Sequence, residues 1–200
     1  MVKLEEYKLV LAVVGLIGVL LLASPVIAAV VRFPGGEQFS ELYVLGPGHM
    51  AENYPYSVVP GRTYSVYVGV GNHLGSSAFY VLYVMFQNRS DTLPNATTGA
   101  PSPSQPLYEY RFAVTDGNVW ENFLSFSVSN TSISANQSMI RQLTVNDVGF
   151  DVDKPSVWDS NSTSYYYRLV LELWLYDSAS NSVQFNSRFV YLQLNLTQSG

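Results

Sequence analysis

Two histidines near glutamates are the first residues in the chain whose types could do chemistry. His49 lies in the segment GPGHM and His73 in the segment GNHLG. Imidazole nitrogens and carboxylates bind divalent metal ions, so a site that joins these histidines to Glu41 or Glu52 is one interpretation. The spacing matches no metal-binding motif, and both histidines lie in turn-like sequence. We therefore favour hydrogen bonds from the histidines to loop backbone and expect no metal here.

An acidic stretch, NDVGFDVDKP, is the second such feature. Calcium takes about six to eight oxygen ligands, which clustered Asp and Asn side chains can supply. The stretch lacks the order of acidic residues that defines an EF-hand loop. A solvated turn is the simpler interpretation, and calcium stays a hypothesis; its candidate ligands are Asn146, Asp147, Asp151 and Asp153. We expect no other cofactor.

The chain shows no pattern typical of an active site. It has no G-x-S-x-G nucleophile elbow, and the absence of cysteine excludes thiol catalysis, Cys-ligated zinc and iron–sulfur chemistry. Carboxylates on expected strands are better explained by pairing with arginine. Glu109, Glu121 and Glu172 are expected to pair in this way with Arg111, Arg188 or Arg168. The sequence therefore predicts no enzyme activity and no catalytic residue.

Six Asn-x-Ser/Thr sequons form the strongest modification signal. They lie at Asn88, Asn95, Asn130, Asn136, Asn161 and Asn195. The Asn, Ser and Thr content would give roughly two by chance, and such acceptors are glycosylated on surfaces outside the cytoplasm. The excess predicts an extracellular domain that carries N-linked glycans.

An uncharged apolar run precedes every sequon. Residues 9–31 lie between Lys8 and Arg32, and a membrane-spanning helix needs roughly 20 such residues. A cleaved signal peptide is the alternative, but its apolar core is shorter, about 7–15 residues. We expect an uncleaved single-pass anchor in the lipid bilayer of the cell membrane, after a cytoplasmic stub of residues 1–8. Gly15 and Gly18 give this helix a small face that suits a partner helix.

The remaining composition favours one β-rich domain. Beyond residue 32, the chain carries 13 acidic and 7 basic residues, and this balance argues against nucleic acid as a partner. The 15 Tyr and 10 Phe suit half-buried pleated surfaces. Residues 32–38 read as a Pro/Gly linker, and residues 39–200 as the extracellular domain.

Apolar and polar residues alternate with a period of two along several segments. The clearest segments are residues 63–70, 108–114, 123–128, 165–176 and 188–196, whereas residues 79–86 are apolar on both faces. Short strands between Gly, Asn and Ser turns are typical of an all-β, immunoglobulin-like antiparallel β-sandwich. We expect seven to nine strands, with residues 132–147 either an edge strand or a short helix.

Two consequences of this pattern concern the surface. Asn195 alternates with Leu194 and Leu196, so we expect its side chain to face solvent. Residues 89–106 contain four Pro and form a long loop, interpreted as a glycan-shielded surface loop or a partner-contacting arm.

Aromatic residues supply the interaction candidates. Trp174 and Tyr176 alternate with the leucines of their strand, so we expect them on the outer face as a protein contact. Trp158 and residues 165–167, YYY, could stack sugars, although ordinary packing is the simpler interpretation.

A family resemblance rests on a few motifs. The chain reads FSELYVLGP from Phe39 and AENYP from Ala51, followed by VGVGNH and the pair Trp120-Glu121. This run resembles an archaeal family of membrane-associated proteins known as a domain of unknown function, number sixteen-sixteen. The resemblance implies an archaeal envelope protein whose β-domain faces outward, and it implies no catalytic residues. The family is associated with several membrane spans, whereas this chain has one apolar run.

Together these features predict a membrane-anchored glycoprotein that is a structural or accessory subunit of a cell-envelope or membrane protein complex. A pilin-like filament subunit is one alternative, because pilins also join an apolar helix to a β-rich head. A surface module that binds glycans or another ligand is the other alternative.

Overall fold

The computed structural model describes residues 7, 8, 10, 12–19, 21, 37–134, 136–160 and 163–197. The chain divides into two units, Met1–Glu37 and Gln38–Gly200. In the first unit, residues 12–19 are helical, with Gly15 and Gly18 among them. Within the described residues no helix has the length and apolar character that a membrane crossing requires. Most of the predicted 9–31 span, and of the stub before it, lies outside the described residues.

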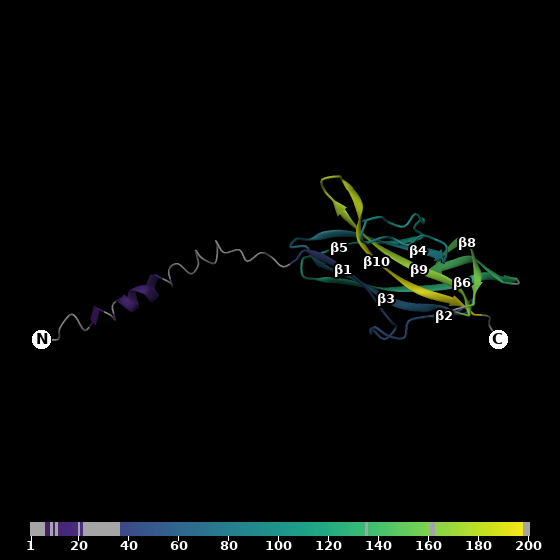
Figure 1. Ribbon diagram of the computed structural model, residues 1–200, viewed down its shortest axis with the longest axis horizontal. Coiled ribbons are helices and arrows are strands. Elements are labelled where there is room, and N and C mark those ends of the chain that lie inside the picture. Colours follow the sequence, from purple (N-terminus) through teal and green to yellow (C-terminus); the bar gives the residue numbers. More distant parts are fainter. Residues whose placement is uncertain are drawn as a thin grey trace. The chain divides into compact units, whose positions relative to one another are not determined.

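The second unit consists of ten described strands, drawn in Figure 1. Their bounds are β1 Phe39–Leu45, β2 Ser57–Val58, β3 Tyr64–His73, β4 Ala78–Asn88, β5 Tyr108–Val114, β6 Val119–Ser134, β7 Gln137–Val145, β8 Val148–Asp159, β9 Ser164–Asp177 and β10 Ser182–Leu196. This confirms the all-β prediction, although the ten described strands exceed the seven to nine that we expected. The segment 132–147, which the sequence left open, is the end of β6 and the whole of β7.

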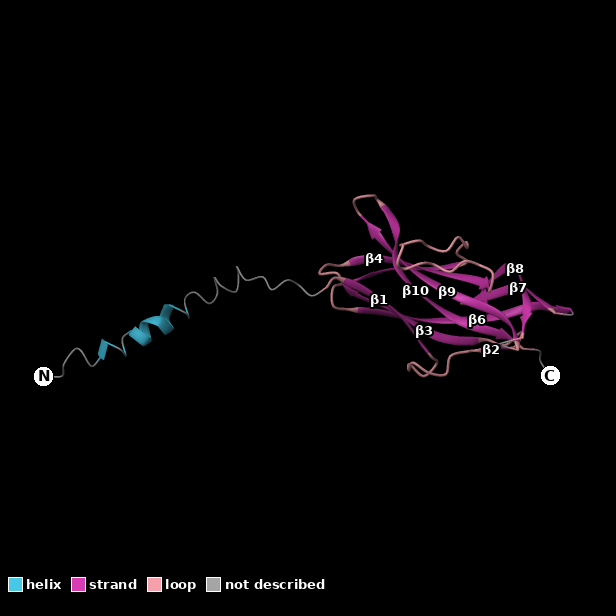
Figure 2. Ribbon diagram, viewed as in Figure 1, coloured by secondary structure: helices cyan, strands magenta, loops and turns pink. Residues whose placement is uncertain are grey.

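The strands form two layers that β8 joins into one curled sheet (Figure 2). The first layer, sheet A, has the order β1-β3-β6-β7-β8. In the second layer, sheet B, β9 lies between β4 and β10, with β5 beyond β4 and β2 beyond β10. Strand β8 passes from one layer to the other, because Trp158 and Asp159 pair with β9. The arrangement is β-sandwich-like, and its one parallel described pair is β2 with β10.

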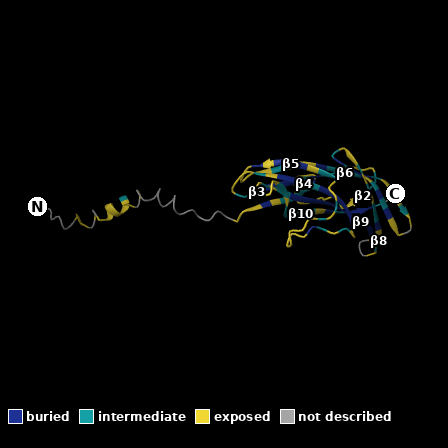
Figure 3. Cartoon of the chain, turned by 90° about the horizontal axis from the view of Figure 1, so that it is seen from above, coloured by how far each residue is buried: buried dark blue, intermediate teal, exposed yellow. Residues whose placement is uncertain are grey.

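The core lies between the layers, where the alternating apolar residues meet (Figure 3). Val66, Val68 and Val70 of β3 are fully buried, as the pattern predicted. The leucines of β9 at 169, 171 and 173 are fully buried too. Burial of a large aliphatic side chain contributes about 1.5–3 kcal/mol, so these two rows are a main source of stability.

Tyrosines from sheet B reach polar groups of sheet A across this core. Tyr80 hydrogen bonds to Ser40 at 2.8 Å, and Tyr167 to Ser138 at 2.8 Å. Tyr110 donates to the carbonyl of Phe123 at 2.9 Å. Each phenol fills apolar volume and ends on a partner, which buried polar groups require.

The 89–106 loop covers part of the outer face of sheet B. Gln87 of β4 and Glu172 of β9 point to that face, yet both side chains are buried. The loop supplies their partners: Ser102 donates its backbone N–H to Glu172 at 2.8 Å, and its hydroxyl accepts from Gln87 at 2.7 Å. Strand β4 therefore has one face in the core, and on its other face the loop covers Gln87.

Local turn chemistry explains the tight β7–β8 hairpin. Asn146 and Asp147 connect the two strands, and both have positive φ, 45° and 65°. A two-residue turn with positive φ at both positions matches the twist of antiparallel strands, and Asn and Asp tolerate that conformation. Two of the four candidate calcium ligands thus form a hairpin turn, the kind of element that the simpler interpretation of this stretch gave.

Candidate functional site

The most chemically varied surface is the outer face of sheet A, formed by β1, β3 and β6. Side chains alternate along a strand, so Ser40, Leu42 and Val44 turn inward and their neighbours turn outward. The outward residues, with His49 from the loop after β1, make up what we call the sheet A face: Phe39, Glu41, Tyr43, His49, Tyr67, His73, Val119, Glu121 and Phe123.

Two glycines of β3 leave room on this face for the side chains of β1. Gly69 lies between Tyr43 and Glu121 in the strand register. A Cβ at Gly69 would lie 2.0 Å from the Tyr43 ring, so that ring crosses the glycine. The Tyr43 hydroxyl then donates to Glu121 at 3.3 Å. Gly71 has the same role under Glu41, whose carboxylate oxygen would lie 2.8 Å from a Cβ.

Glu121 is the centre of a small polar cluster. His49 Nδ1 lies 3.0 Å from its carboxylate, and the imidazole lies 3.6 Å from the Tyr67 ring centroid. Burial, followed by the nearby Glu121 charge, raises the pKa of the Tyr43 hydroxyl above its ordinary value. The tyrosine therefore stays neutral and serves as a hydrogen-bond donor to the glutamate.

Among the described residues neither imidazole hydrogen bonds to loop backbone, the interpretation that the sequence favoured; each ring lies beside a glutamate instead. His73 Nε2 lies 3.6 Å from Glu41, and its ring stacks on Phe39 at 4.7 Å. His49 was placed with Glu52 as one option, and the structure pairs it with Glu121 instead. Across the described part of the chain, no group of three or more His, Cys, Asp or Glu side chains is placed to hold a metal ion. The candidate calcium ligands Asp147, Asp151 and Asp153 are therefore not gathered into such a group.

Large apolar side chains lie exposed beside these polar groups. Phe39, Val119 and Phe123 all belong to the sheet A face, and Met50 follows His49 in the loop. Isolated exposed apolar residues are normal on a soluble domain, but several on one sheet face with a polar cluster among them are typical of a contact surface. This combination can dock a partner, and nothing in it supplies a nucleophile paired with a base.

Comparison with family models gives one match, which covers residues 34–140 and is described as "Domain of unknown function (DUF1616)". The chain belongs to the DUF1616 family. The resemblance in the sequence is thereby confirmed as to family, and strands β1, β3 and β6 fall entirely within the matched residues. The sheet A face is thus built from the part of the chain that the family shares.

Other comparisons add little to the DUF1616 assignment. No curated protein matches the chain. Similar solved structures include a β-glucosidase from Listeria innocua, at 9% identity and a TM-score of 0.40, with 81% of this chain and 16% of that one covered. The CARDB domain of the PF1109 protein from Pyrococcus furiosus, in complex with di-metal ions, has 9% identity and a TM-score of 0.38, with coverages of 80% and 90%. The chain spans only a small part of the glucosidase, and these scores support no argument about function.

The sequons of this DUF1616 protein differ sharply in exposure. Asn95, Asn130 and Asn136 are exposed, whereas Asn161 lies outside the described residues. Asn195 is only 3% exposed, so the prediction that it faces solvent was wrong. Strand β2 pairs with the end of β10 at that position, and the Asn195 side-chain oxygen is buried without a hydrogen-bond partner. Asn88 is buried as well, and its side-chain nitrogen donates to the carbonyl of Pro155 at 2.8 Å.

The predicted aromatic contacts are only partly at the surface. Tyr176 and Trp158 are exposed, while Trp174 is half-buried. Trp174 donates its indole N–H to Glu172 at 3.0 Å and meets Tyr83 edge-on. Tyr176 belongs to the end of the β9–β10 hairpin, which leaves the body of the domain in Figure 1.

Gly15 and Gly18 belong to the other unit and have open space around them.

The YYY segment does not form a sugar-stacking platform as a whole. Tyr165 and Tyr167 are buried, and only Tyr166 is partly accessible.

Among the glutamates, Glu109 pairs with Arg111 at 2.6 Å along one strand, as expected for its partner. Glu172 does not pair with Arg168. Burial raises its pKa above the usual range, and its bonds to Ser102 and the Trp174 indole oppose that rise.

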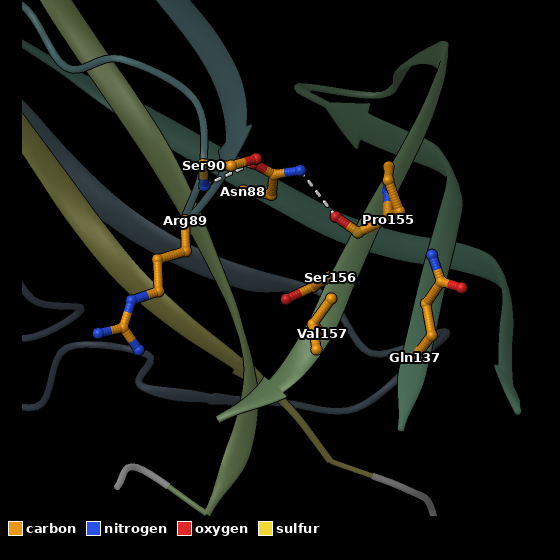
Figure 4. A pocket seen from close by; sticks show the side chains of 7 residues that line it. All are labelled: Asn88, Arg89, Ser90, Gln137, Pro155, Ser156 and Val157. Carbon is orange, nitrogen blue, oxygen red and sulfur yellow. Dashed lines mark hydrogen bonds between the residues drawn. The ribbon is translucent and has the colours of Figure 1, made fainter. Parts of the chain in front are cut away.

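Sequence reasoning missed a row of three hollows beside β8, β9 and β10. The first lies between the Asn88–Ser90 turn and β8 and measures about 340 Å³ (Figure 4). The second, also about 340 Å³, includes Arg89 and Arg168, and the third, about 260 Å³, includes Tyr56 and Tyr191. The only signal in the sequence was the high tyrosine content, which does not say which rings lie at the surface.

Proposed function

We propose that this DUF1616 member is a single-pass, membrane-anchored archaeal glycoprotein whose immunoglobulin-like β-domain faces outward. In this proposal it acts as a structural or accessory subunit of a cell-envelope or membrane protein complex. The apolar run at residues 9–31 supports the anchor, because it is long enough to span a bilayer. The sequons support the outward orientation, and three of them lie on exposed side chains.

The sheet A face is the observation that carries the proposal. It presents exposed apolar side chains around two carboxylates, Glu41 and Glu121. Recognition surfaces commonly combine an apolar centre with charged groups that select the partner. We infer a protein partner that offers aromatic or aliphatic side chains with Lys or Arg opposite these glutamates. The domain carries a net negative charge, which complements a basic partner of this kind.

Extraction of the native protein in mild detergent tests this function. The mass and composition of the extracted assembly are measured, and the mature N-terminus is read from the same sample. We expect a discrete assembly that contains other membrane subunits and a chain that begins at Met1. A lone glycosylated monomer would favour a glycan-binding module, and a processed polymer would favour a filament subunit.

Matched substitutions then locate the contact. Val119→Ser and Phe123→Ser remove apolar side chains from the sheet A face, while Val148→Ser removes a valine of similar exposure, 46% against 52% for Val119, from the β7–β8 hairpin. We expect the first two variants to lose the partner subunits and the third to retain them. Retention of all partners in Val119→Ser and Phe123→Ser would refute the sheet A face as the contact. Glu121→Lys should weaken the assembly by charge reversal.

A further inference from the structure

The three hollows lie in a row, because each neighbouring pair shares a lining residue. Arg89 lines the first and the second hollow, and Gln193 lines the second and the third. We call this the β8–β10 groove. A row of adjoining hollows fits a chain-like ligand of several units better than one compact molecule. The groove and the sheet A face have no residue in common.

Tyrosines at one end of the groove are held in place with their rings accessible. Tyr54 donates its hydroxyl to the carbonyl of Val44 at 2.9 Å. Gln193 donates to the Tyr56 hydroxyl at 3.3 Å, and the backbone of Asn195 donates to the Tyr56 carbonyl at 2.7 Å. Tyr54, Tyr56 and Tyr191 are nevertheless 40–50% exposed. Rings fixed before binding lose little freedom when a ligand stacks on them.

The middle of the groove contains a buried arginine, one of whose side-chain nitrogens donates no hydrogen bond. Arg168 is only 6% exposed, and its Nη2 donates to the carbonyls of Asn88 and Asp91, at 2.7 Å each. Its Nε is buried without a hydrogen-bond partner. The guanidinium lies 5.7 Å from the Tyr166 ring and 6.0 Å from the Tyr191 ring, so it borders the aromatic part of the groove.

The charge balance at this point favours an anion. Arg89 forms an ion pair with Asp159, which leaves that pair neutral. No carboxylate among the described residues forms an ion pair with Arg168. A buried cation whose bonds go only to carbonyl oxygens is incompletely compensated, and a carboxylate is the usual complement of a guanidinium.

We propose that the β8–β10 groove binds an acidic oligosaccharide, with a hexuronate carboxylate near Arg168 and neighbouring sugar rings on Tyr56 and Tyr191. The apolar faces of sugars pack on aromatic rings, and side-chain amides such as that of Gln193 hydrogen bond to hydroxyl groups. A peptide would instead need a free strand edge or deep side-chain pockets. This inference goes beyond the proposed docking function.

Calorimetric titration of the full chain provides the test. The protein is kept in a detergent without a sugar headgroup, because such headgroups would compete for the groove. The probes are trigalacturonate, trimannuronate, the methyl ester of trigalacturonate, maltotriose and hexaglutamate. We expect at least one acidic trisaccharide to bind about tenfold or more tightly than the neutral probes, and the methyl ester to lose that advantage. The proposal fails if neither acidic trisaccharide binds, if the ester binds equally well, or if hexaglutamate binds as tightly.

A matched pair of variants assigns the binding to the groove. Tyr191→Ala removes a groove tyrosine that is 44% exposed, and Tyr176→Ala removes a hairpin tyrosine that is 42% exposed. We expect Tyr191→Ala to weaken the acidic trisaccharide about tenfold, the order of one aromatic stacking contact, and Tyr176→Ala to leave affinity within about twofold. Equal losses in both variants would overturn the assignment. Because the sheet A variants leave the groove untouched, failure of this site is distinguishable from failure of the docking function.

Discussion

Because two tyrosines are buried in the core, we predict that the β-domain loses stability at alkaline pH. Burial raises the pKa of both the Tyr110 and the Tyr167 hydroxyl from the ordinary value of 10.0 to about 12. Between these two values the folded protein holds protons that the unfolded chain has released. Stability is therefore fully present below pH 10 and is lost as the pH rises towards 12.

The magnitude follows from the shift. One pKa unit corresponds to about 1.4 kcal/mol, so each tyrosine contributes about 2 kcal/mol of destabilisation by pH 11.5, and the two together about 4 kcal/mol. A domain of this kind has a total free energy of unfolding of about 5–15 kcal/mol, so the loss is large. Urea unfolding at pH 9, 10, 11 and 11.5 measures it, and absorbance of tyrosinate reports ionisation in the same samples.

The Tyr167→Phe variant separates this mechanism from general charge repulsion. At pH 9 the variant should be less stable than wild type by about 1–3 kcal/mol, because Ser138 is left buried without a partner. At pH 11.5 it should escape its share of the alkaline loss, so the gap between variant and wild type closes. High salt screens surface repulsion but not desolvation, and the wild-type slope should persist in it. Identical pH slopes in variant and wild type would refute the reasoning.

Three further predictions concern other parts of the domain. Because burial raises the Glu172 pKa, the free energy of unfolding of the wild type falls as the pH rises from 4.5 through the folded-state pKa. In guanidinium unfolding over this pH range, the Glu172→Gln variant should lose less stability than the wild type. Parallel curves of stability against pH would contradict this. Gly69→Ala should destabilise by about 1–3 kcal/mol in thermal or urea unfolding, and Tyr43→Ala in the same chain should relieve that cost. Glycopeptide mass spectrometry should find glycan on Asn95 but none on buried Asn195, and full occupancy of Asn195 would mean that this end of β10 opens.

Strand faces were predictable because they depend on neighbouring residues alone. A period of two places Val66, Val68 and Val70 together whatever the rest of the chain does, and all three are buried. The same reasoning placed Tyr110 and Phe112 on the inner face of β5, where both are buried. The class of fold followed from several such segments with turns between them.

What covers each face was not predictable, because it depends on residues far away in the sequence. Asn195 alternates with Leu194 along β10, yet its side chain is only 3% exposed, so this face of the strand is covered where solvent was expected. Gln87 and Glu172 are buried for the same kind of reason, because the 89–106 loop folds over them. Period-two patterns assign residues to faces and carry no information about the element that packs on a face.

The sheet A face shows the same division between local and distant information. Glu41 was one of two glutamates considered as neighbours of the histidines, and it lies 3.6 Å from His73, although the strand β1 that carries it was not predicted. The contact of His49 with Glu121 joins a loop to a strand much later in the chain. Gly69 lets the Tyr43 ring reach across β3 to the same glutamate. Only the strand register reveals that role of the glycine.

The absence of cysteine gives the tyrosines between the layers a structural importance that composition alone did not suggest. Many β-sandwiches tie their two sheets with a disulfide, and this chain has no cysteine. Tyr80, Tyr110 and Tyr167 instead end on sheet A partners, at three separate points of the core. Such ties are specific in register, because a strand that slips by one residue would bury each hydroxyl without its partner. They are also independent of redox conditions, so the fold should remain unchanged in reducing and oxidising surroundings and should fail first at high pH.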